Sequence, residues 1–151
     1  MAIFDAMLEL SDDQDLSQTA GTFSSTYAID FVNTDLEMGA GEPLWLNIKM
    51  GTESLLSSAA ATLTIALARD TDSTIDSSST VIYQTPALAI AACTAGSWLL
   101  RMPLPYNVDE DDFVGLLYTI GTHDTTAGTV DAWIDHGPQS SFDTQVSASN
   151  I

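Results

Sequence analysis

The stretch "PLWLNIKM", residues 43–50, decides the fold. Every second residue in it is large and apolar, while a tryptophan, an amide and a lysine lie between them. A repeat of two is the period of a half-buried β-strand, whereas an amphipathic helix repeats roughly every 3.6 residues. The apolar set is Leu44, Leu46, Ile48 and Met50, and the alternate set is Trp45, Asn47 and Lys49.

The same alternation returns along most of the chain. Runs of Gly, Asp, Ser and Thr separate the alternating segments, as expected of turns between strands. About seven or eight strands with no convincing helix predict an all-β protein, an antiparallel two-sheet β-sandwich of the jelly-roll type. Phe113 and Leu117 lie opposite the apolar face of their segment, which indicates a strand covered on both sides. The further segments are residues 27–31, 61–68, 79–84, 98–103, 113–120 and 130–134.

The length of 151 residues and the hydrophobic content of 45% fit one packed domain. We expect the β-sandwich at residues 25–136 and a C-terminal extension at residues 137–151, where the alternation is lost. Before the sandwich, Ser11 is followed three residues later by Gln14, which fits a capping box and predicts a single helical turn.

The charge is strongly negative, with 21 acidic residues against 3 basic ones and a formal net charge of −18. Nucleic acids and anionic membrane surfaces are therefore not expected as partners, because binding to either needs Lys or Arg to neutralise phosphate. Such a charge is found in proteins adapted to high salt, and it would also suit a basic docking surface. The composition alone leaves both explanations open.

The single cysteine, Cys93, follows the apolar run "ALAIAA" and is predicted to be a buried structural thiol. One cysteine excludes an intrachain disulfide. The first residues lack the basic and apolar regions of a secretory signal, and no segment approaches the roughly 18 uninterrupted apolar residues of a membrane helix. We therefore expect a protein made in a reducing cytoplasm.

No catalytic constellation emerges, so we expect neither an enzyme nor a cofactor. His123 and His136 each adjoin an aspartate, but no serine or cysteine in a nucleophile context accompanies them. Two acidic loops concentrate the oxygen ligands that calcium prefers. Because 16 of the 21 acids are aspartate, composition explains these loops equally well, and no metal site is expected. The weak calcium candidates are Asp70, Asp72, Asp76, Asp109 and Asp111.

The three tryptophans, Trp45, Trp98 and Trp133, lie in predicted strands. Trp133 faces opposite to the apolar set around it. Exposed aromatic rings on a β-sandwich can stack on sugars, which keeps a carbohydrate-binding module open as an alternative function. Packing in the core or at a subunit interface is favoured, because interfaces are enriched in aromatic residues.

Several longer pieces occur in a recognisable order: "FDAMLELSDDQDL" at residues 4–16, "GEPLWLNI" at 41–48, "LLRMPLP" at 99–105 and "TAGTVDAWI" at 126–134. In this order the sequence resembles the jelly-roll capsid cement proteins of tailed phages, of the type known from a Bordetella bacteriophage. The resemblance covers nearly the whole chain.

The resemblance implies a structural virion protein that binds the outer surface of an icosahedral head and bridges neighbouring major capsid proteins. It also implies self-association as a dimer or trimer at a symmetry axis. It further implies that residues 1–24 form an N-terminal arm, whose apolar residues would bury against a neighbouring subunit or the capsid. The residues expected at such interfaces are Ile3, Phe4, Met7, Leu8, Leu10, Trp45 and Trp133.

Overall fold

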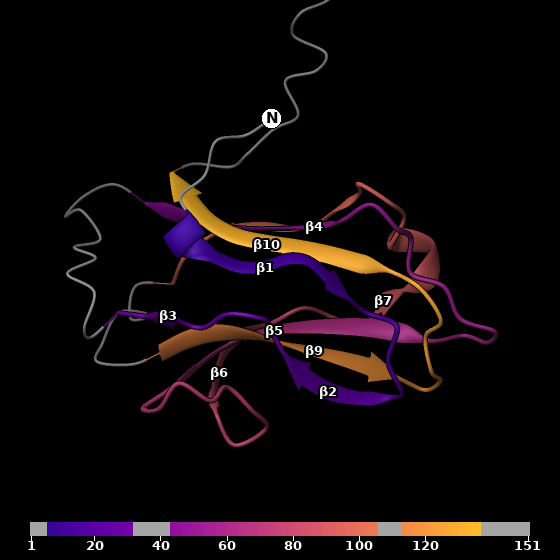
Figure 1. The fold of residues 1–151 in the computed structure, drawn as a ribbon, viewed down its shortest axis with the longest axis horizontal. Coiled ribbons are helices and arrows are strands. Elements are labelled where there is room, and N and C mark those ends of the chain that lie inside the picture. Colours follow the sequence, from indigo (N-terminus) through magenta and orange to yellow (C-terminus); the bar gives the residue numbers. More distant parts are fainter. Residues whose placement is uncertain (1–5, 32–42, 106–112, 137–151) are drawn as a thin grey trace, which may run out of the picture.

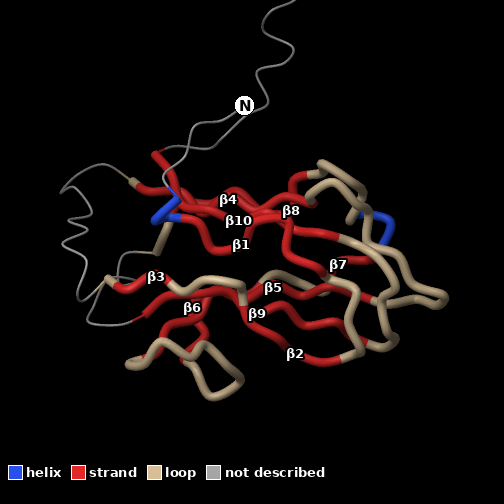
Figure 2. The backbone as a smooth tube through the Cα atoms, viewed as in Figure 1, coloured by secondary structure: helices blue, strands red, loops and turns tan. Residues whose placement is uncertain are grey.

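The structure, a computed structural model, describes residues 6–31, 43–105 and 113–136. In these ranges the chain forms two antiparallel β-sheets stacked face to face, with no α-helix. Figures 1 and 2 show the sheets as two layers of strands, one above the other. The predicted all-β, two-sheet architecture is confirmed.

The four-stranded sheet contains, in order, β1 (Glu9–Asp15), β10 (Thr129–His136), β4 (Leu44–Met50) and β8 (Trp98–Pro103). The six-stranded sheet contains, in order, β2 (Gly21–Ser24), β9 (Phe113–Gly121), β5 (Thr62–Asp70) and β6 (Thr80–Gln84). Its two short strands are β3 (Ile29–Asp30), beside β9, and β7 (Leu88–Ala89), beside β5. Two 3-10 turns are present, η1 (Ala6–Leu8) and η2 (Ile90–Ala92). Neither turn is a membrane-span candidate, and no helix in the described ranges is long and apolar enough to be one.

The strand order is that of a jelly roll, in which one long hairpin folds over on itself. The strand pairs are nested along the chain: β1 pairs with β10, β2 with β9, β4 with β8, and the consecutive strands β5 and β6 pair at the centre. Successive pairs alternate between the two sheets. The inner faces of the two sheets therefore enclose a common core.

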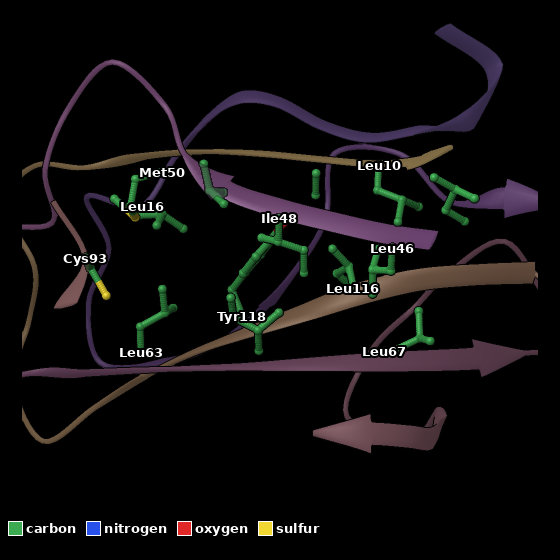
Figure 3. Close-up of a cluster of buried hydrophobic side chains, with 14 of the residues drawn as sticks. Leu10, Leu16, Leu46, Ile48, Met50, Leu63, Leu67, Cys93, Leu116 and Tyr118 are labelled. Atoms are coloured by element: carbon green, nitrogen blue, oxygen red, sulfur yellow. The ribbon is translucent and has the colours of Figure 1, made fainter. Parts of the chain in front are cut away.

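That core is built from the inward positions of the alternating segments (Figure 3). Leu46 and Ile48 of β4 lie opposite Leu116 and Tyr118 of β9, and all four are fully buried. Burying one such aliphatic side chain contributes about 1.5–3 kcal/mol relative to leaving it in water. Cys93 also belongs to this cluster and is buried, as predicted.

One buried polar contact joins the two sheets across the core. The hydroxyl oxygens of Tyr118 on β9 and Ser11 on β1 are 2.9 Å apart and form a hydrogen bond. Both residues are 0% exposed, so each hydroxyl needs a partner inside the protein. The contact therefore fixes how β1 sits over the six-stranded sheet.

The outer face of the six-stranded sheet is partly covered by the chain itself. The segment between β5 and β6 returns over this face, and its Ile75 packs against Ala66, Ala68 and Leu117 in a second apolar cluster. Gly115 on β9 makes room for it, because an added Cβ would lie 2.8 Å from Cγ1 of Ile75. The prediction that the strand around Leu117 is covered on both sides is thus confirmed.

The predicted arm at residues 1–24 needs correction. Residues 9–15 form β1 at one edge of the four-stranded sheet, and residues 21–24 form β2, which pairs with β9. Leu10 and Leu16 are 0% exposed and belong to the core. The β-sandwich therefore begins by residue 9, while residues 1–5 and the predicted extension at 137–151 lie outside the described residues.

The predicted helical turn at Ser11 is also wrong, because this segment is a strand with irregular register. The pairing of β1 with β10 shifts between Glu9 and Ser11 and again between Ser11 and Gln14, and Asp13 has a positive φ of 44°. The Ser11 hydroxyl donates to the Gln14 side chain at 2.6 Å rather than capping a backbone N–H. Bulges of this kind let a polar segment serve as an edge strand.

Candidate functional site: an aromatic and cationic sheet face

The outer face of the four-stranded sheet gathers the side chains with the greatest capacity for binding. Residues paired across antiparallel strands point to the same side of a sheet, so the register shows which side chains share this face. Asn47 lies between Trp133 and Arg101, Lys49 between Asp131 and Trp98, and Trp45 between Asp135 and Pro103. All three tryptophans of the chain and two of its three basic residues are therefore on one face.

Two of these tryptophans are in contact with each other, and a basic side chain lies over the ring of each. The ring centroids of Trp98 and Trp133 are 5.8 Å apart, with the ring planes tilted by 53°. The guanidinium carbon of Arg101 lies 4.6 Å from the centre of the Trp98 ring, and the Lys49 ammonium lies 5.8 Å from the centre of the Trp133 ring. Both distances are within the range of cation–π attraction. The result is a continuous stack across β8, β10 and β4.

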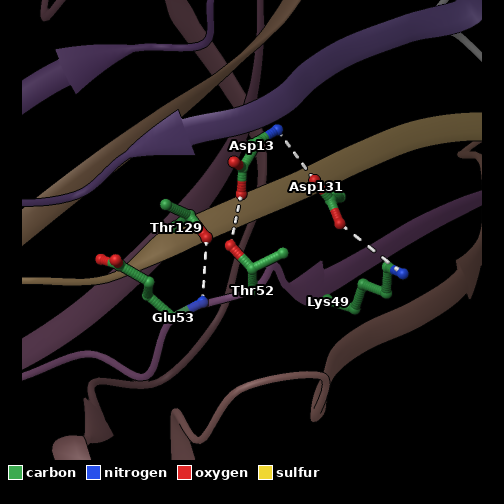
Figure 4. A network of polar contacts seen from close by, with 6 residues as sticks. All are labelled: Asp13, Lys49, Thr52, Glu53, Thr129 and Asp131. Carbon is green, nitrogen blue, oxygen red and sulfur yellow. Dashed lines mark hydrogen bonds and ion pairs between the residues drawn. The ribbon is translucent and has the colours of Figure 1, made fainter.

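The Lys49 end of the stack continues into a polar network that reaches β1 (Figure 4). Lys49 forms an ion pair with Asp131 at 3.6 Å, and the other oxygen of Asp131 accepts a hydrogen bond from the backbone N–H of Asp13 at 2.8 Å. The positive φ of Asp13 belongs to the irregular part of β1, so Asp131 holds that irregularity in place. Side chains thus connect all four strands across this face.

Hydrogen bonds and burial shift the pKa values of two carboxyl groups near this network. A hydrogen bond from the Thr129 hydroxyl, with others from Thr52, lowers the pKa of Asp13. Thr52 donates to the same carboxylate at 3.3 Å, as Figure 4 shows. Desolvation, together with the charges of Asp12 and Asp131, raises the pKa of Glu9. The hydrogen bonds from Thr129 and Thr52 therefore favour the carboxylate form of Asp13.

The local charge of this face differs from that of the whole chain. The register places Lys49 and Arg101 on it together with Glu9, Asp15, Asp131 and Asp135, and the hydrogen bond from Thr129 places the Asp13 carboxylate there as well. Two cations thus meet five carboxylates here, whereas the chain as a whole has 3 basic against 21 acidic residues. The proportion of cations on this face is therefore higher than in the chain as a whole.

The residues expected at an interface differ in how far they are buried. Leu10 is fully buried within its own chain and Trp133 is only 4% exposed, so neither is available to a partner. Trp133 does point away from the core, but Trp98 and Lys49 pack over it. Leu8 is partly buried against the core, Trp45 is half-buried, and Met7 is 60% exposed. Ile3 and Phe4 lie outside the described residues.

The acidic loop at residues 70–76 uses its carboxylates for local turns. Asp70 accepts a hydrogen bond from the Thr71 N–H, Asp72 from the Thr74 N–H, and Asp76 from both the N–H and the hydroxyl of Ser78. The two hydrogen bonds from Ser78 lower the pKa of Asp76. Within the described ranges no three His, Cys, Asp or Glu side chains gather as a metal site would require. The other calcium candidates, Asp109 and Asp111, lie outside those ranges.

The sequence alone did not assign Trp98, Lys49, Arg101 and Asp131 to a common site. Their alternation within each strand was readable, but their assembly on one face depends on how β8, β4 and β10 pair. The usable signal was the position of Trp45, Trp133, Lys49 and Arg101 opposite the apolar sets of their strands. Trp98 has the spacing of the apolar set, and only the register shift between β4 and β8 brings it to this face.

Comparison with known protein families gives a match to most of the chain. The model of the Bbp16 family matches residues 10–134, which include nearly all of both sheets. The name of that family suggests a protein of a Bordetella phage. No curated protein sequence matches the chain.

Proposed function

Because this chain belongs to the Bbp16 family, a family of phage proteins by its name, we propose that it is a capsid cement protein. In this role it binds the outer surface of a tailed-phage head and bridges neighbouring copies of the major capsid protein. The role is structural rather than catalytic. Its location is the virion, after synthesis in the host cytoplasm.

The observation that carries the proposal is the family match over residues 10–134 of a β-sandwich. The position of the best binding groups agrees with it. The tryptophans and cations lie on a broad sheet face rather than in an enclosed cavity, and a broad face suits a large protein surface better than a small molecule. The sequence resemblance to jelly-roll cement proteins points the same way.

A cement protein gains its effect from repetition. A modest contact made by each subunit of a dimer or trimer, at many equivalent places on a shell, adds up to strong attachment without any single tight site. Bridging neighbouring capsid proteins then stabilises the shell against the pressure of packaged DNA, because the bridges must break before the shell opens.

The direct test is co-sedimentation with shells assembled from the major capsid protein of the same phage and prepared without the chain. We expect saturable binding with a fixed number of copies per shell, and decorated shells should withstand higher temperature than bare ones. Bare shells that bind none of the protein, or that open at the same temperature when decorated, would refute the cement role. The same protein after heat denaturation serves as the control.

A carbohydrate-binding module is the second candidate, favoured by the half-buried rings of Trp45 and Trp98 on the outer face. A sugar ring can stack on an aromatic side chain only where the face of that side chain is partly exposed. This role predicts a monomer that binds glycans on an array, with binding lost in Trp98→Ala. Absence of any glycan signal from the intact protein would remove this candidate.

A further inference from the structure

We propose that two copies of this chain pack together through the outer face of the six-stranded sheet, across a two-fold axis. This inference rests on the proposed cement function, in which the chain associates with itself, and it goes further by naming the face and the number of copies. The charges and the hydroxyl groups of the described residues assign the face.

One part of this outer face carries only small uncharged side chains. Thr22 on β2 pairs with Thr119 on β9, which pairs with Thr64 on β5, so three threonines form a row across three strands. Neighbouring rows add further hydroxyl and amide groups. The exposed or half-buried members, here called the threonine face, are Thr22, Ser24, Thr62, Thr64, Gln84 and Thr119.

The carboxylates on the outer side of this sheet lie at its other end. Asp30 and Asp70 both pair with Phe113, which places them in one row. The next row contains Gly115, and Ile75 packs over it. The threonine face begins beyond that row and contains no charged residue.

This lack of charge sets the strands of the threonine face apart from the rest of the chain. The outer face of the four-stranded sheet carries two cations and five carboxylates. Residues 54–68 and 77–100 include no charged residue, although a chain with 16% charged residues would place about four in the longer of these segments. The two segments supply most of β5 and all of β6 and β7. A face left in water would share the charges of the chain, whereas the centre of an interface is depleted of them, so the threonine face has the composition of a covered surface.

Charge also identifies the partner. A basic partner would be met by carboxylates, which this chain has in excess. A partner that is itself strongly negative can pack only where no like charges are desolvated together. A second copy carries the same net charge of −18, so the threonine face is the surface on which it meets the least repulsion.

The hydroxyl groups suit a contact between identical surfaces. The hydroxyl oxygens of Thr22 and Thr119 are 2.8 Å apart, and either can donate the hydrogen bond between them. Because a hydroxyl both donates and accepts, a row of threonines can form hydrogen bonds with its own copy across a two-fold axis. The side chains are short, and Gly121 leaves room for the Thr62 hydroxyl, since an added Cβ would lie 2.6 Å from its oxygen. Two such low faces can pack as stacked sheets do, about 10 Å apart.

The test introduces a charge on the threonine face and measures the oligomeric state. Thr64→Glu and Thr64→Lys place a charge of either sign in the threonine row. Thr94→Glu and Thr94→Lys are the matched controls, because Thr94 is exposed and lies in the turn before β8 of the other sheet. Light scattering coupled to size-exclusion chromatography, over a range of protein concentrations at moderate and molar salt, gives the mass of each protein. Melting temperatures report whether each variant is folded.

We expect the wild type and both Thr94 variants to be dimers. Both Thr64 variants should dimerise at least about tenfold more weakly, because either charge would be buried without a partner. A wild type that stays a monomer, or that forms trimers, would overturn the proposal, since packing through one face joins two copies. Unchanged dimerisation of folded Thr64→Glu and Thr64→Lys would overturn it as well. Tighter dimers of Thr64→Lys alone would reveal an acidic surface opposite the face and refute a contact between two threonine faces.

Co-sedimentation of the wild type with shells separates this inference from the cement function. A monomeric wild type that binds shells would overturn the dimer and leave the cement function standing. A dimer that is weakened in both Thr64 variants but binds no shells would support the threonine face and refute the cement function.

Discussion

Leu10 tests the revised role of the N-terminal segment, because an arm and a core strand make opposite predictions for it. Replacing it with alanine removes a side chain that is 0% exposed and packed in the core between the sheets. Leucine-to-alanine changes at such sites cost about 3 kcal/mol of unfolding free energy, the transfer of the lost atoms plus the cavity they leave. In a domain of this size that loss lowers the melting temperature by roughly 6–12 °C.

Met7→Ala is the matched control, since Met7 lies three residues earlier and is 60% exposed. We expect this change to alter the unfolding free energy by less than about 0.5 kcal/mol. The measurement is urea unfolding of both variants followed by circular dichroism, with thermal melts in parallel. Equal stability of the Leu10→Ala and Met7→Ala proteins would show that residues 9–15 do not contribute a core strand, and the arm interpretation would return.

Four further outcomes follow from the described contacts. Tyr118→Phe should cost about 1 kcal/mol by urea unfolding, and a double-mutant cycle with Ser11→Ala should show positive coupling, since the two hydroxyls are 2.9 Å apart in the core; zero coupling would contradict that bond. Gly115→Ala should lower the free energy of unfolding by about 1–3 kcal/mol, because its Cβ would lie 2.8 Å from Ile75. Adding Ile75→Ala to the same chain should recover part of this loss, whereas strictly additive effects of the two changes would argue against the clash. Burial raises the pKa of Cys93 from 9.0 to about 11, so between these pH values the folded state keeps a thiol proton that the unfolded state has lost. The free energy of unfolding should therefore fall as pH rises from about 9 toward 11. A smaller fall in Cys93→Ala is the check. Raising salt from low to molar concentration should raise the melting temperature, because it screens repulsion within a chain of net charge −18; an unchanged melting temperature would exclude that repulsion as a significant cost.

The strands that follow a clean alternation were predictable from the sequence. Residues 44–50 form β4 with Leu46 and Ile48 in the core, as their spacing of two indicates. Leu117, on the opposite side of its strand from the core set, is buried under Ile75 as its apolar character suggested. Local pattern was sufficient in these cases because β4 keeps one register with β10, and β9 keeps one register with β5.

β1 was missed because its pattern is broken. Two shifts of register between Glu9 and Gln14 interrupt the period of two, and only Leu10 and Leu16 mark the buried side. A polar edge strand of this kind is held by its neighbour and by single contacts such as the bond from Ser11 to Tyr118, and neither leaves a periodic signal.

The candidate site was predictable only in part. Trp45 and Trp133 could be placed opposite the core set, but the burial of Trp133 depends on Trp98, which a different strand supplies. Which strands become neighbours is a property of the jelly-roll pairing and not of any one segment. The cation stack on this face was therefore visible only once β4, β8 and β10 were placed side by side.

The pairing of β1 with β10 has a consequence for how the protein is made. These two strands lie side by side, although most of the described chain separates them (Figure 1). The bond from Ser11 to Tyr118 spans 107 positions in the sequence. A ribosome releases β1 and β2 first, and both must wait for β9 and β10 before their hydrogen bonds and core contacts can form. The complete sandwich therefore forms only after β9 and β10 have been synthesised, and pairing between strands so far apart in the sequence is slow. The high negative charge helps to keep the incomplete chain from aggregating.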